Sequence, residues 1–306
     1  MSKCVISINN VTKNYGVNRG NFDINLKIHE GETIGIVGEN GAGKTTLIRQ
    51  IMGFIESDEG NIQIYQMDAY KDAAKTKQYI GYIPGEINFP DVKSGNVFLH
   101  SYGTSLGMKE DDFQYADEII QRMQLDIRAY PKRMSKGMKQ KTAIVAAFMR
   151  KAPIILMDEP TTGLDPLMRD EFLKLVEEQK KRNATMLISS NTIEELERVC
   201  DKVALISKGR VVAIAELNEI KHRHFRTYKI EFKKDDEYLN FLKTRDDIIR
   251  VQPEYNQVTI KCDLYKIPEL LKEVSNYDIK FVSEVKYNLT NYFDEIRKNK
   301  EKNNVD

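Results

Sequence analysis

The sequence predicts an α/β protein that carries a second, small α+β domain at its C-terminal end. A short apolar run, Thr33–Gly38, ends in glycine, and a helical pattern follows over Lys44–Met52, so strand, glycine-rich turn and helix succeed one another as in a βαβ unit. Two further apolar runs, Ile154–Met157 and Thr185–Ser189, have the composition of buried strands. Between them, Leu167–Lys181 spaces its apolar residues at helical intervals, which predicts a helix.

Alternation of apolar and polar residues, or apolar residues at helical spacing, predicts the other elements of the larger domain. In chain order these are strands at Cys4–Asn9 and Phe22–Ile28, a helical region over Val92–Tyr130 with a clear helical period in Asp112–Met123, an apolar helix at Thr142–Met149, and a hairpin over Val203–Ile214 that turns at Lys208–Gly209.

The segment Lys221–Arg226 marks a domain boundary, because the pattern changes after it to the order β-α-β-β-α-β of a ferredoxin-like domain. The expected elements are strands at Tyr228–Phe232, Ile248–Val251, Val258–Cys262 and Ile279–Val282, with helices at Asp235–Leu242 and Ile267–Val274. We therefore expect a first domain over residues 1–220, a small α+β accessory domain over 226–285, and a C-terminal helix and charged tail over 286–306.

Composition excludes several classes of protein. The 306 residues hold 47 Lys plus Arg against 46 Asp plus Glu, a net charge of +1, so no basic excess favours a nucleic-acid partner. No apolar run approaches the roughly 20 residues that span a bilayer. The N-terminus lacks the layout of a signal peptide. Three scattered cysteines predict reduced thiols in a cytosolic protein.

The turn at Gly38–Thr45 fits the phosphate-binding pattern G-x-x-x-x-G-K-[ST] at the strand-to-helix junction that its mechanism requires. Its backbone N–H groups and the start of the following helix are suited to an anion. Lys44 can reach the β- and γ-phosphates of a nucleotide, and the Thr45 hydroxyl can bind Mg²⁺. The predicted ATP ligands are Gly38, Glu39, Asn40, Gly41, Ala42, Gly43, Lys44, Thr45 and Thr46.

Two carboxylates follow the apolar run at Ile154. Asp158 is expected at the C-terminal end of a buried parallel strand, where it would hold Mg²⁺. Glu159 would orient and deprotonate the attacking water. An Asp-Glu pair after an apolar run is by itself more often a solvated strand end. The phosphate-binding loop makes the catalytic interpretation the better one.

A third motif, Met134–Lys141, stands directly before the apolar helix, and with it the chain resembles the ATP-binding subunit of ABC transporters over roughly Cys4–Ala215. The resemblance implies a P-loop ABC-type ATPase with a helical subdomain at about 88–135 and an antiparallel β subdomain. It also implies a head-to-tail dimer with a second, identical or different ATPase subunit. The signature residues Ser135, Lys136, Gly137 and Met138 would then bind the ATP held by the partner subunit.

Three further positions match the family. Tyr15 stands where an aromatic residue stacks on adenine, with a plain strand-end aromatic as the alternative. Asp165, in the Thr162–Asp165 segment, resembles the loop that touches the partner subunit. Ser189–Asn191 corresponds to the switch region that contacts the γ-phosphate.

Two departures from the family bear on hydrolysis more than on nucleotide binding. Asn191 replaces the usual switch histidine, and an amide can donate a hydrogen bond but cannot carry a proton at neutral pH. Gly85 stands where a glutamine is expected. Glu86 is a candidate substitute as a Mg²⁺-side contact through water, and a plain loop acid is the alternative.

The leading hypothesis is an ATPase motor subunit on the cytoplasmic face of the cell membrane, bound to a separate permease whose coupling helices would meet Gly85–Asp91 and Val92–Tyr130. The motifs look most like those of ABC-2-type exporters for drugs or peptides. Two alternatives stay open: a soluble, non-transport ABC ATPase, and an ATP-gated dimerisation module with little turnover. The role of the C-terminal domain is open, and His222 with His224 would make a poor metal site.

Overall fold

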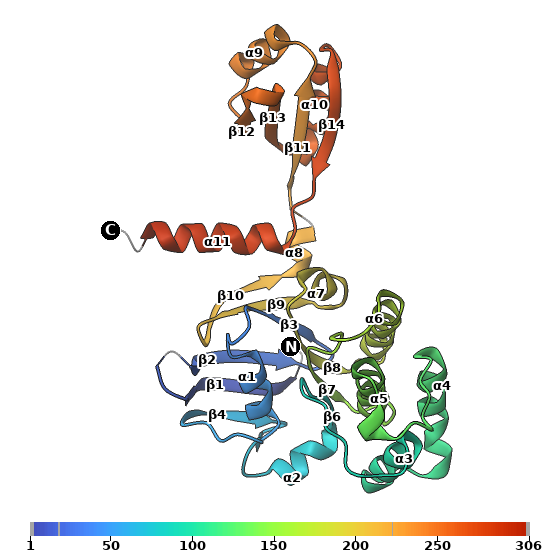
Figure 1. Ribbon diagram of the computed structural model, residues 1–306. Coiled ribbons are helices and arrows are strands. Elements are labelled where there is room, and N and C mark those ends of the chain that lie inside the picture. The colour runs from blue at the N-terminus through green and yellow to red at the C-terminus, as the bar shows by residue number, and fades with distance from the viewer. Residues whose placement is uncertain (1–2, 18, 222, 304–306) are drawn as a thin grey trace. The chain divides into compact units, whose positions relative to one another are not determined.

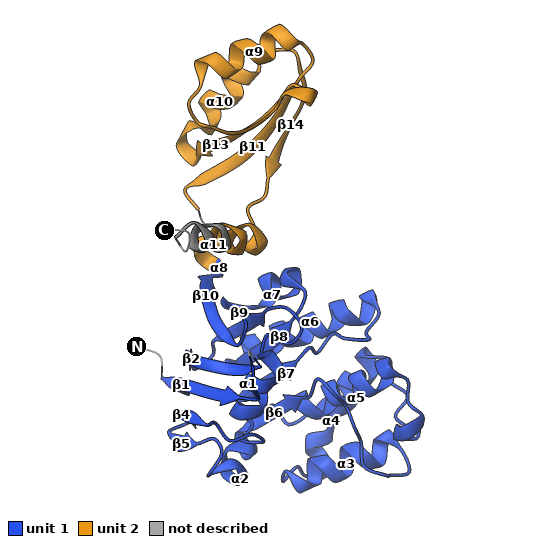
Figure 2. Cartoon of the chain, turned by 60° about the vertical axis from the view of Figure 1, so that its left-hand side comes forward, with its two compact units in different colours: residues 1–217 blue, residues 218–306 orange. Residues whose placement is uncertain are grey.

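The computed structural model describes residues 3–17, 19–221 and 223–303, without the side chains of Lys221 and of residues 297–303. The chain divides into two compact units, Met1–Leu217 and Asn218–Asp306 (Figure 2). His222, which the sequence raised as half of a possible metal site, lies outside the described residues.

The first unit is built on a six-stranded sheet with the order β10-β9-β3-β8-β7-β6. Its strands are β3 (Thr33–Val37), β6 (Ile80–Ile83), β7 (Ile154–Asp158), β8 (Thr185–Ser190), β9 (Lys202–Ser207) and β10 (Arg210–Glu216). All neighbours pair in parallel except β9 and β10, which form the expected hairpin. Every residue of β3, β7 and β8 is buried, as their continuous apolar runs predict.

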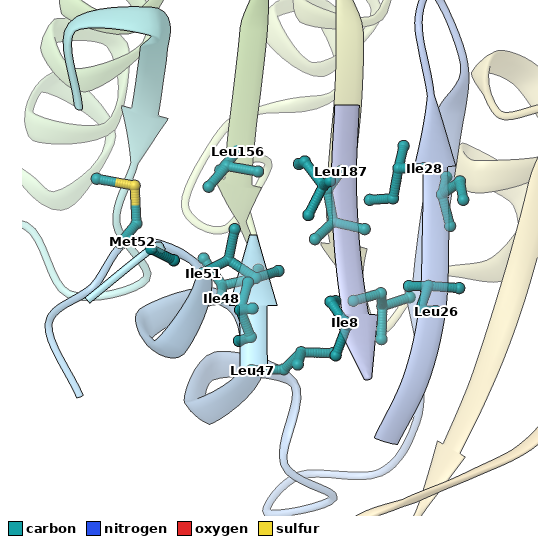
Figure 3. Close-up of a cluster of buried hydrophobic side chains, with 14 of the residues drawn as sticks. Ile8, Leu26, Ile28, Leu47, Ile48, Ile51, Met52, Leu156 and Leu187 are labelled. Carbon is teal, nitrogen blue, oxygen red and sulfur yellow. The ribbon is translucent and has the colours of Figure 1, made fainter. Parts of the chain in front are cut away.

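A second sheet of this unit is four-stranded and antiparallel, with the order β2-β1-β4-β5. Its strands are β1 (Cys4–Asn14), β2 (Gly20–His29), β4 (Glu59–Ile64) and β5 (Met67–Asp68). One core joins this sheet to the main sheet through helix α1 (Lys44–Ile51). Figure 3 shows Leu47 and Ile48 of α1 among side chains of both sheets, Ile8 of β1 and Leu156 of β7 included. This core fixes the start of α1, where the phosphate-binding loop ends.

Helices cover the rest of the first unit. They are α2 (Ala73–Thr76), α3 (Gly95–Ser105), α4 (Gln114–Arg122), α5 (Lys136–Phe148), α6 (Pro166–Lys181) and α7 (Ile193–Val199), and α8 (Leu217–Lys221) spans the limit between the units. Three short 3₁₀ turns accompany them at Lys77–Tyr79, Glu110–Phe113 and Pro131–Arg133. The region expected to be helical holds α3 and α4, which pack on α5 (Figure 1). Arg122 of α4 bonds Glu171 and Glu178 of α6 at 2.6 and 2.8 Å.

Three of these strands, β4, β5 and β6, are not predicted from the sequence. Strand β5 has only two residues, too few to form a pattern. In β4, only Ile62 and Ile64 are buried, so its alternation is too short to stand out. In β6, four residues include a glycine, and a Cβ on Gly81 would lie 2.2 Å from the carbonyl oxygen of Ala147. The close approach of α5 to β6 therefore requires a residue that lowers strand propensity.

The second unit is a four-stranded antiparallel sheet, ordered β12-β13-β11-β14, with two helices packed on it. Its elements are β11 (Phe225–Phe232), α9 (Asp235–Thr244), β12 (Ile248–Gln252), β13 (Gln257–Asp263), α10 (Ile267–Val274) and β14 (Ile279–Val285), with 3₁₀ turns at Pro253–Tyr255 and Leu264–Lys266. The β-α-β-β-α-β order agrees with the expected one. The core contains Ile230 and Phe232 of β11, Phe241 of α9 and Leu270 of α10.

Helix α11 (Leu289–Asn303) follows the second sheet, and residues 304–306 of the expected tail lie outside the described part. All three cysteines are free, with Cys200 and Cys262 buried. Within the described ranges, none of the helices combines the length and the apolarity that a membrane-spanning segment needs.

Candidate active site

The turn from β3 to α1 holds the phosphate-binding loop. Gly41 and Gly43 have φ angles of +80° and +108°, in the left-handed region that favours glycine. A Cβ on Gly43 would lie 2.2 Å from Oδ1 of Asn21. No acidic residue stands in the first turn of α1, and no side chain caps it. Its first N–H groups are therefore available to an anion, as the sequence predicts.

A cavity of about 430 Å³ opens over this loop. It is lined by Tyr15, Arg19, Gly20, Asn40, Gly41, Ala42, Gly43, Lys44, Thr45, Thr46 and Glu159. The structure thus brings the predicted adenine-stacking ring and the predicted general base to the phosphate-binding loop. The side chain of Tyr15 is exposed, so its ring is accessible. Arg19 was not among the predicted residues, because no motif marks a cation four residues after the aromatic position.

Lys44 is buried beneath the loop. Its Nζ donates to the carbonyl oxygens of Gly38 at 2.7 Å and Glu39 at 3.2 Å, and to Oδ1 of Asn191 at 2.8 Å. Oε1 of Glu159 lies 3.8 Å away. Burial lowers the pKa of Lys44, while the charges of Glu159 and Asp158 act in the opposite sense.

Asp158 ends β7 and is fully buried. Its Oδ1 accepts a 2.6 Å hydrogen bond from the Ser189 hydroxyl, and its Oδ2 has no hydrogen-bond partner among the residues that the structure describes. A buried carboxylate oxygen without a partner is costly, and a bound cation removes that cost. The donor set of Asp158 and the Thr45 hydroxyl therefore fits Mg²⁺, which prefers oxygen ligands.

Glu159 has a φ of +48°, which is uncommon outside glycine. Its N–H donates to the hydroxyl of Ser189 at 2.9 Å and to the carbonyl of Ser189 at 3.2 Å. The neighbouring strand β8 thus holds this backbone in a strained conformation, a feature that concentrates at functional sites. The result is a carboxylate that turns out of the sheet into the cavity.

Asn191, directly after β8, connects the loop with the carboxylate of Glu159, the predicted base. Its Oδ1 accepts from Lys44, while its Nδ2 donates to Oε1 of Glu159 at 2.9 Å and to Oδ1 of Asn40 at 3.2 Å. The residue at the switch position is therefore placed against three predicted site residues. Nearby in the chain, the hydroxyls of Thr161 and Ser190 donate to Glu195 of α7 at 2.9 and 3.2 Å.

The predicted signature residues lie at the start of α5, and none of them lines the cavity of its own chain. Ser135 caps the helix, with its Oγ accepting from the N–H of Met138 at 3.2 Å. A Cβ on Gly137 would lie 2.9 Å from the carbonyl oxygen of Gly163. Lys136 packs against the same glycine: its Cγ would stand 3.1 Å from a Cβ there.

Two more contacts position this region. Gln140 of α5 is buried and donates to the carbonyl oxygen of Pro160 at 2.7 Å, one residue after Glu159. Asp165 caps α6 by accepting from the N–H of Met168 at 2.9 Å. No sequence motif predicts the role of Gln140, because its partner is a backbone carbonyl 20 residues away.

Gly85 and Glu86, the two residues at the expected glutamine position, have different surroundings in the structure. A Cβ on Gly85 would lie 2.7 Å from Oδ2 of Asp158, so the backbone of residue 85 stands at the predicted cation site. Glu86 is largely exposed, lies 3.9 Å from Arg49 and does not line the cavity. Its part in binding Mg²⁺ stays a prediction. Elsewhere in the described chain, no group of three or more His, Cys, Asp or Glu side chains is placed to hold a metal ion.

This fold and this cavity are those of a nucleotide-binding P-loop protein. The family described as ABC transporter matches residues 22–162. The chain is 37% identical over 195 residues to the ABC transporter ATP-binding protein NatA of Bacillus subtilis (strain 168), covering 62% of this chain and 79% of that protein. It is 33% identical over 222 residues to the linearmycin resistance ATP-binding protein LnrL of the same organism, covering 72% and 71%.

Among solved structures, the ATP-binding subunit of an ABC transporter aligns with a TM-score of 0.66 at 28% identity, covering 72% of this chain and 92% of that one. The chain belongs to the ABC transporter family. It is an ATP-binding subunit of a transporter and an ATPase of that family.

Proposed function

We propose that this ATPase is the motor of an exporter: ATP closes a head-to-tail dimer, and hydrolysis reopens it, while a separate membrane permease carries the substrate. The observation that supports this most is that Lys44 and Glu159 both line one cavity over the phosphate-binding loop, while Asn191 bonds the side chains of both. Such an arrangement can bind a triphosphate and place a base beside its last phosphate.

In this proposal the loop residues from Gly38 to Thr46 bind the phosphates of ATP, and Tyr15 stacks on the base. The Thr45 hydroxyl and Asp158 would hold Mg²⁺, which neutralises charge that develops on the phosphates. Glu159 accepts the proton of the attacking water. Asn191 holds the carboxylate of Glu159 by a neutral hydrogen bond, so its position does not depend on protonation of residue 191.

The second half of each ATP site would come from another subunit. Ser135, Lys136, Gly137 and Met138 stand at the start of a 13-residue helix and outside the cavity of their own chain. A helix N-terminus with free N–H groups attracts a phosphate. Asp165 would touch the partner in the same interface. This geometry supports a head-to-tail dimer with an identical or a related ATPase subunit.

The direction and the cargo of transport are inferred from relatives. LnrL is named for resistance to linearmycin, and resistance to a toxic compound is commonly achieved by exporting it. We therefore propose a drug-like or peptide-like amphiphile as cargo. The subunit would bind the cytoplasmic face of the membrane through its permease, with α3 and α4 of the helical region beside the contact.

A steady-state ATPase assay on the purified chain, alone and with its permease in lipid vesicles, tests this proposal. We expect phosphate release that Glu159→Gln abolishes and that the permease stimulates. Glu177→Gln is a suitable control, because Glu177 lies on α6, pairs with Arg198 at 2.8 Å and does not line the cavity. Equal phosphate release by wild type and Glu159→Gln would overturn the motor function.

A second candidate, favoured by Gly85 and Asn191, is a module that dimerises with ATP but hardly hydrolyses it. In that case ATP-dependent dimerisation would be present in light scattering, and phosphate release would stay at the level of Glu159→Gln even with the permease.

A further inference from the structure

We propose that Asp58 is a positioning residue for the nucleotide base: it fixes the segment of residues 13–16 so that the ring of Tyr15 faces the cavity. This inference rests on the proposed function in one respect, since it takes Tyr15 to stack on the base of ATP. Asp58 belongs to none of the motifs of the sequence, and it does not itself line the cavity.

Asp58 uses both carboxylate oxygens on the end of β1. Oδ1 accepts a 2.7 Å hydrogen bond from Nζ of Lys13, and Oδ2 accepts a 2.7 Å hydrogen bond from the backbone N–H of Asn14. The backbone N–H of Asp58 donates to the carbonyl of Thr12 at 2.8 Å. Two hydrogen bonds hold the carboxylate and a third holds the backbone of Asp58, so this side chain has little freedom to reorient.

These three residues directly precede Tyr15. From Asn14 onward the segment closes on itself: Oδ1 of Asn14 accepts from the N–H of Gly16 at 2.9 Å, and the N–H of Tyr15 donates to the carbonyl of Arg19 at 2.8 Å. Asp58 therefore ties a self-contained turn to the strand pair β1–β4, where Thr12 pairs with Glu59.

The ion pair also places a cation beside the ring. Nζ of Lys13, held by Asp58, lies 5.9 Å from the ring centroid of Tyr15, within range of a cation–π contact. The ring itself is 52% exposed, so little else restrains it. A preordered ring loses less conformational freedom when a base stacks on it, and this raises affinity without adding a contact.

The carboxyl group of Asp58 must be ionised to hold Lys13 and Asn14 in this way. The N–H of Asn14 and then the ammonium of Lys13 hold the pKa of Asp58 below its ordinary value. The carboxylate is therefore ionised throughout the neutral range, and its hold on the segment does not vary there.

The chain has no tryptophan, so Tyr15→Trp places a single tryptophan at the stacking position, and its emission can be excited apart from that of the tyrosines. We would titrate this full-length variant with Mg·ATP, with and without Asp58→Ala, and measure ATP binding in parallel by calorimetry. Thermal unfolding of each protein checks that it is folded. Asp72→Ala is the matched control, since Asp72 is also a surface carboxylate paired with a lysine, Lys75 at 2.9 Å, but it directly precedes α2 and does not line the cavity.

Asp58→Ala is expected to raise the Kd for ATP by about three- to tenfold, which corresponds to the net free energy of about one hydrogen bond. In the Tyr15 protein, it should raise KM and leave kcat at saturating ATP unchanged. Lys13→Ala should have a smaller effect, because the bond from Asn14 to Asp58 remains. Asp72→Ala should leave Kd unchanged.

Two results would overturn the inference, and they differ. If the tryptophan responds to ATP with the same Kd in the presence and absence of Asp58, Asp58 has no positioning role and the stacking function of residue 15 stands. If calorimetry detects ATP binding but the tryptophan signal does not change even with Asp58 intact, residue 15 does not stack on the base. The stacking part of the proposed function then fails together with the inference.

Discussion

The side-chain amide of Asn191 donates a 2.9 Å hydrogen bond to Oε1 of Glu159. Because its oxygen accepts from Lys44 at the same time, one neutral side chain links the predicted phosphate-binding lysine to the predicted base. An imidazole in its neutral form could make the same two bonds, whereas an imidazolium could not accept from Lys44. The asparagine itself does not titrate, so its own part in this connection does not change with pH.

Replacing Asn191 with histidine should therefore create a pH dependence that the wild type lacks. A histidine titrates near pH 6.5 when unperturbed, so the kcat of Asn191→His should fall as the pH drops through about 6.5. Asn191→Ala should be slower by about tenfold at all pH values, because the carboxylate of Glu159 loses a donor that holds it. Steady-state ATPase profiles between pH 5.5 and 8 measure both. Superimposable profiles for Asn191→His and wild type would contradict this role.

Gly85→Gln, which restores the residue that the family usually has, should impair the enzyme. A Cβ at this position would lie 2.7 Å from Oδ2 of Asp158, so the buried carboxylate or the backbone has to move. Displacement of a group at the predicted cation site is expected to lower kcat by on the order of ten- to a hundredfold. The control is Glu177→Gln, since Glu177 of α6 pairs with Arg198 and does not line the cavity. A Gly85→Gln enzyme faster than wild type would contradict this prediction and would show that the chain lacks a useful glutamine ligand at position 85.

Much of this fold follows from local patterns. The buried runs at Ile154 and Thr185 are long enough, and bounded clearly enough, to predict central strands, and both are fully buried. The phosphate-binding loop is equally local, because its glycines and Lys44 act within nine residues of chain. The side-chain hydrogen bonds that sequence reasoning did not predict join residues far apart in the chain. Lys44 and Asn191 are 147 residues apart, and Lys13 and Asp58 are 45 residues apart.

The short strands escaped prediction for a related reason. The residues of β4 and β6 pair with β1 and β7, and their few apolar positions gain meaning only from those partners. Gly81 in particular opposes strand formation locally, yet it is required by the carbonyl of Ala147. A single sequence does not contain that information in any local window.

Ser135→Arg should separate ATP binding from dimerisation. Ser135 lies outside the cavity of its own chain, so the Kd for ATP should be unchanged. A bulky cation at the start of α5 should block the approach of the partner's nucleotide. Light scattering with ATP, in a Glu159→Gln background that prevents turnover, measures this. Ser135→Ala is the control for bulk and charge: it removes the helix cap, at about 1 kcal/mol of stability, and one predicted ligand of the partner's ATP, but it adds no obstacle and should still dimerise. Equal dimerisation of both variants would refute the predicted role.

Gln140 is expected to act through the backbone next to Glu159. Its Nε2 is the donor for the carbonyl of Pro160, and both groups are buried. Gln140→Met keeps the shape of the side chain but leaves that carbonyl without a partner, which costs about 1–3 kcal/mol of folding free energy. Because Pro160 directly follows the strained backbone of Glu159, kcat should fall as well, while the Kd for ATP should not change.

The chain offers a matched control for this prediction. Gln179 is also a fully buried glutamine of the first unit, and it donates to the Tyr115 hydroxyl at 2.7 Å. It lies on α6 and does not line the cavity. Gln179→Met should therefore lose a comparable amount of stability, measured by urea unfolding, but keep its kcat at a temperature where both variants are folded. If kcat falls equally in the two variants, the loss follows from general destabilisation, and Gln140 has no specific role in holding Glu159.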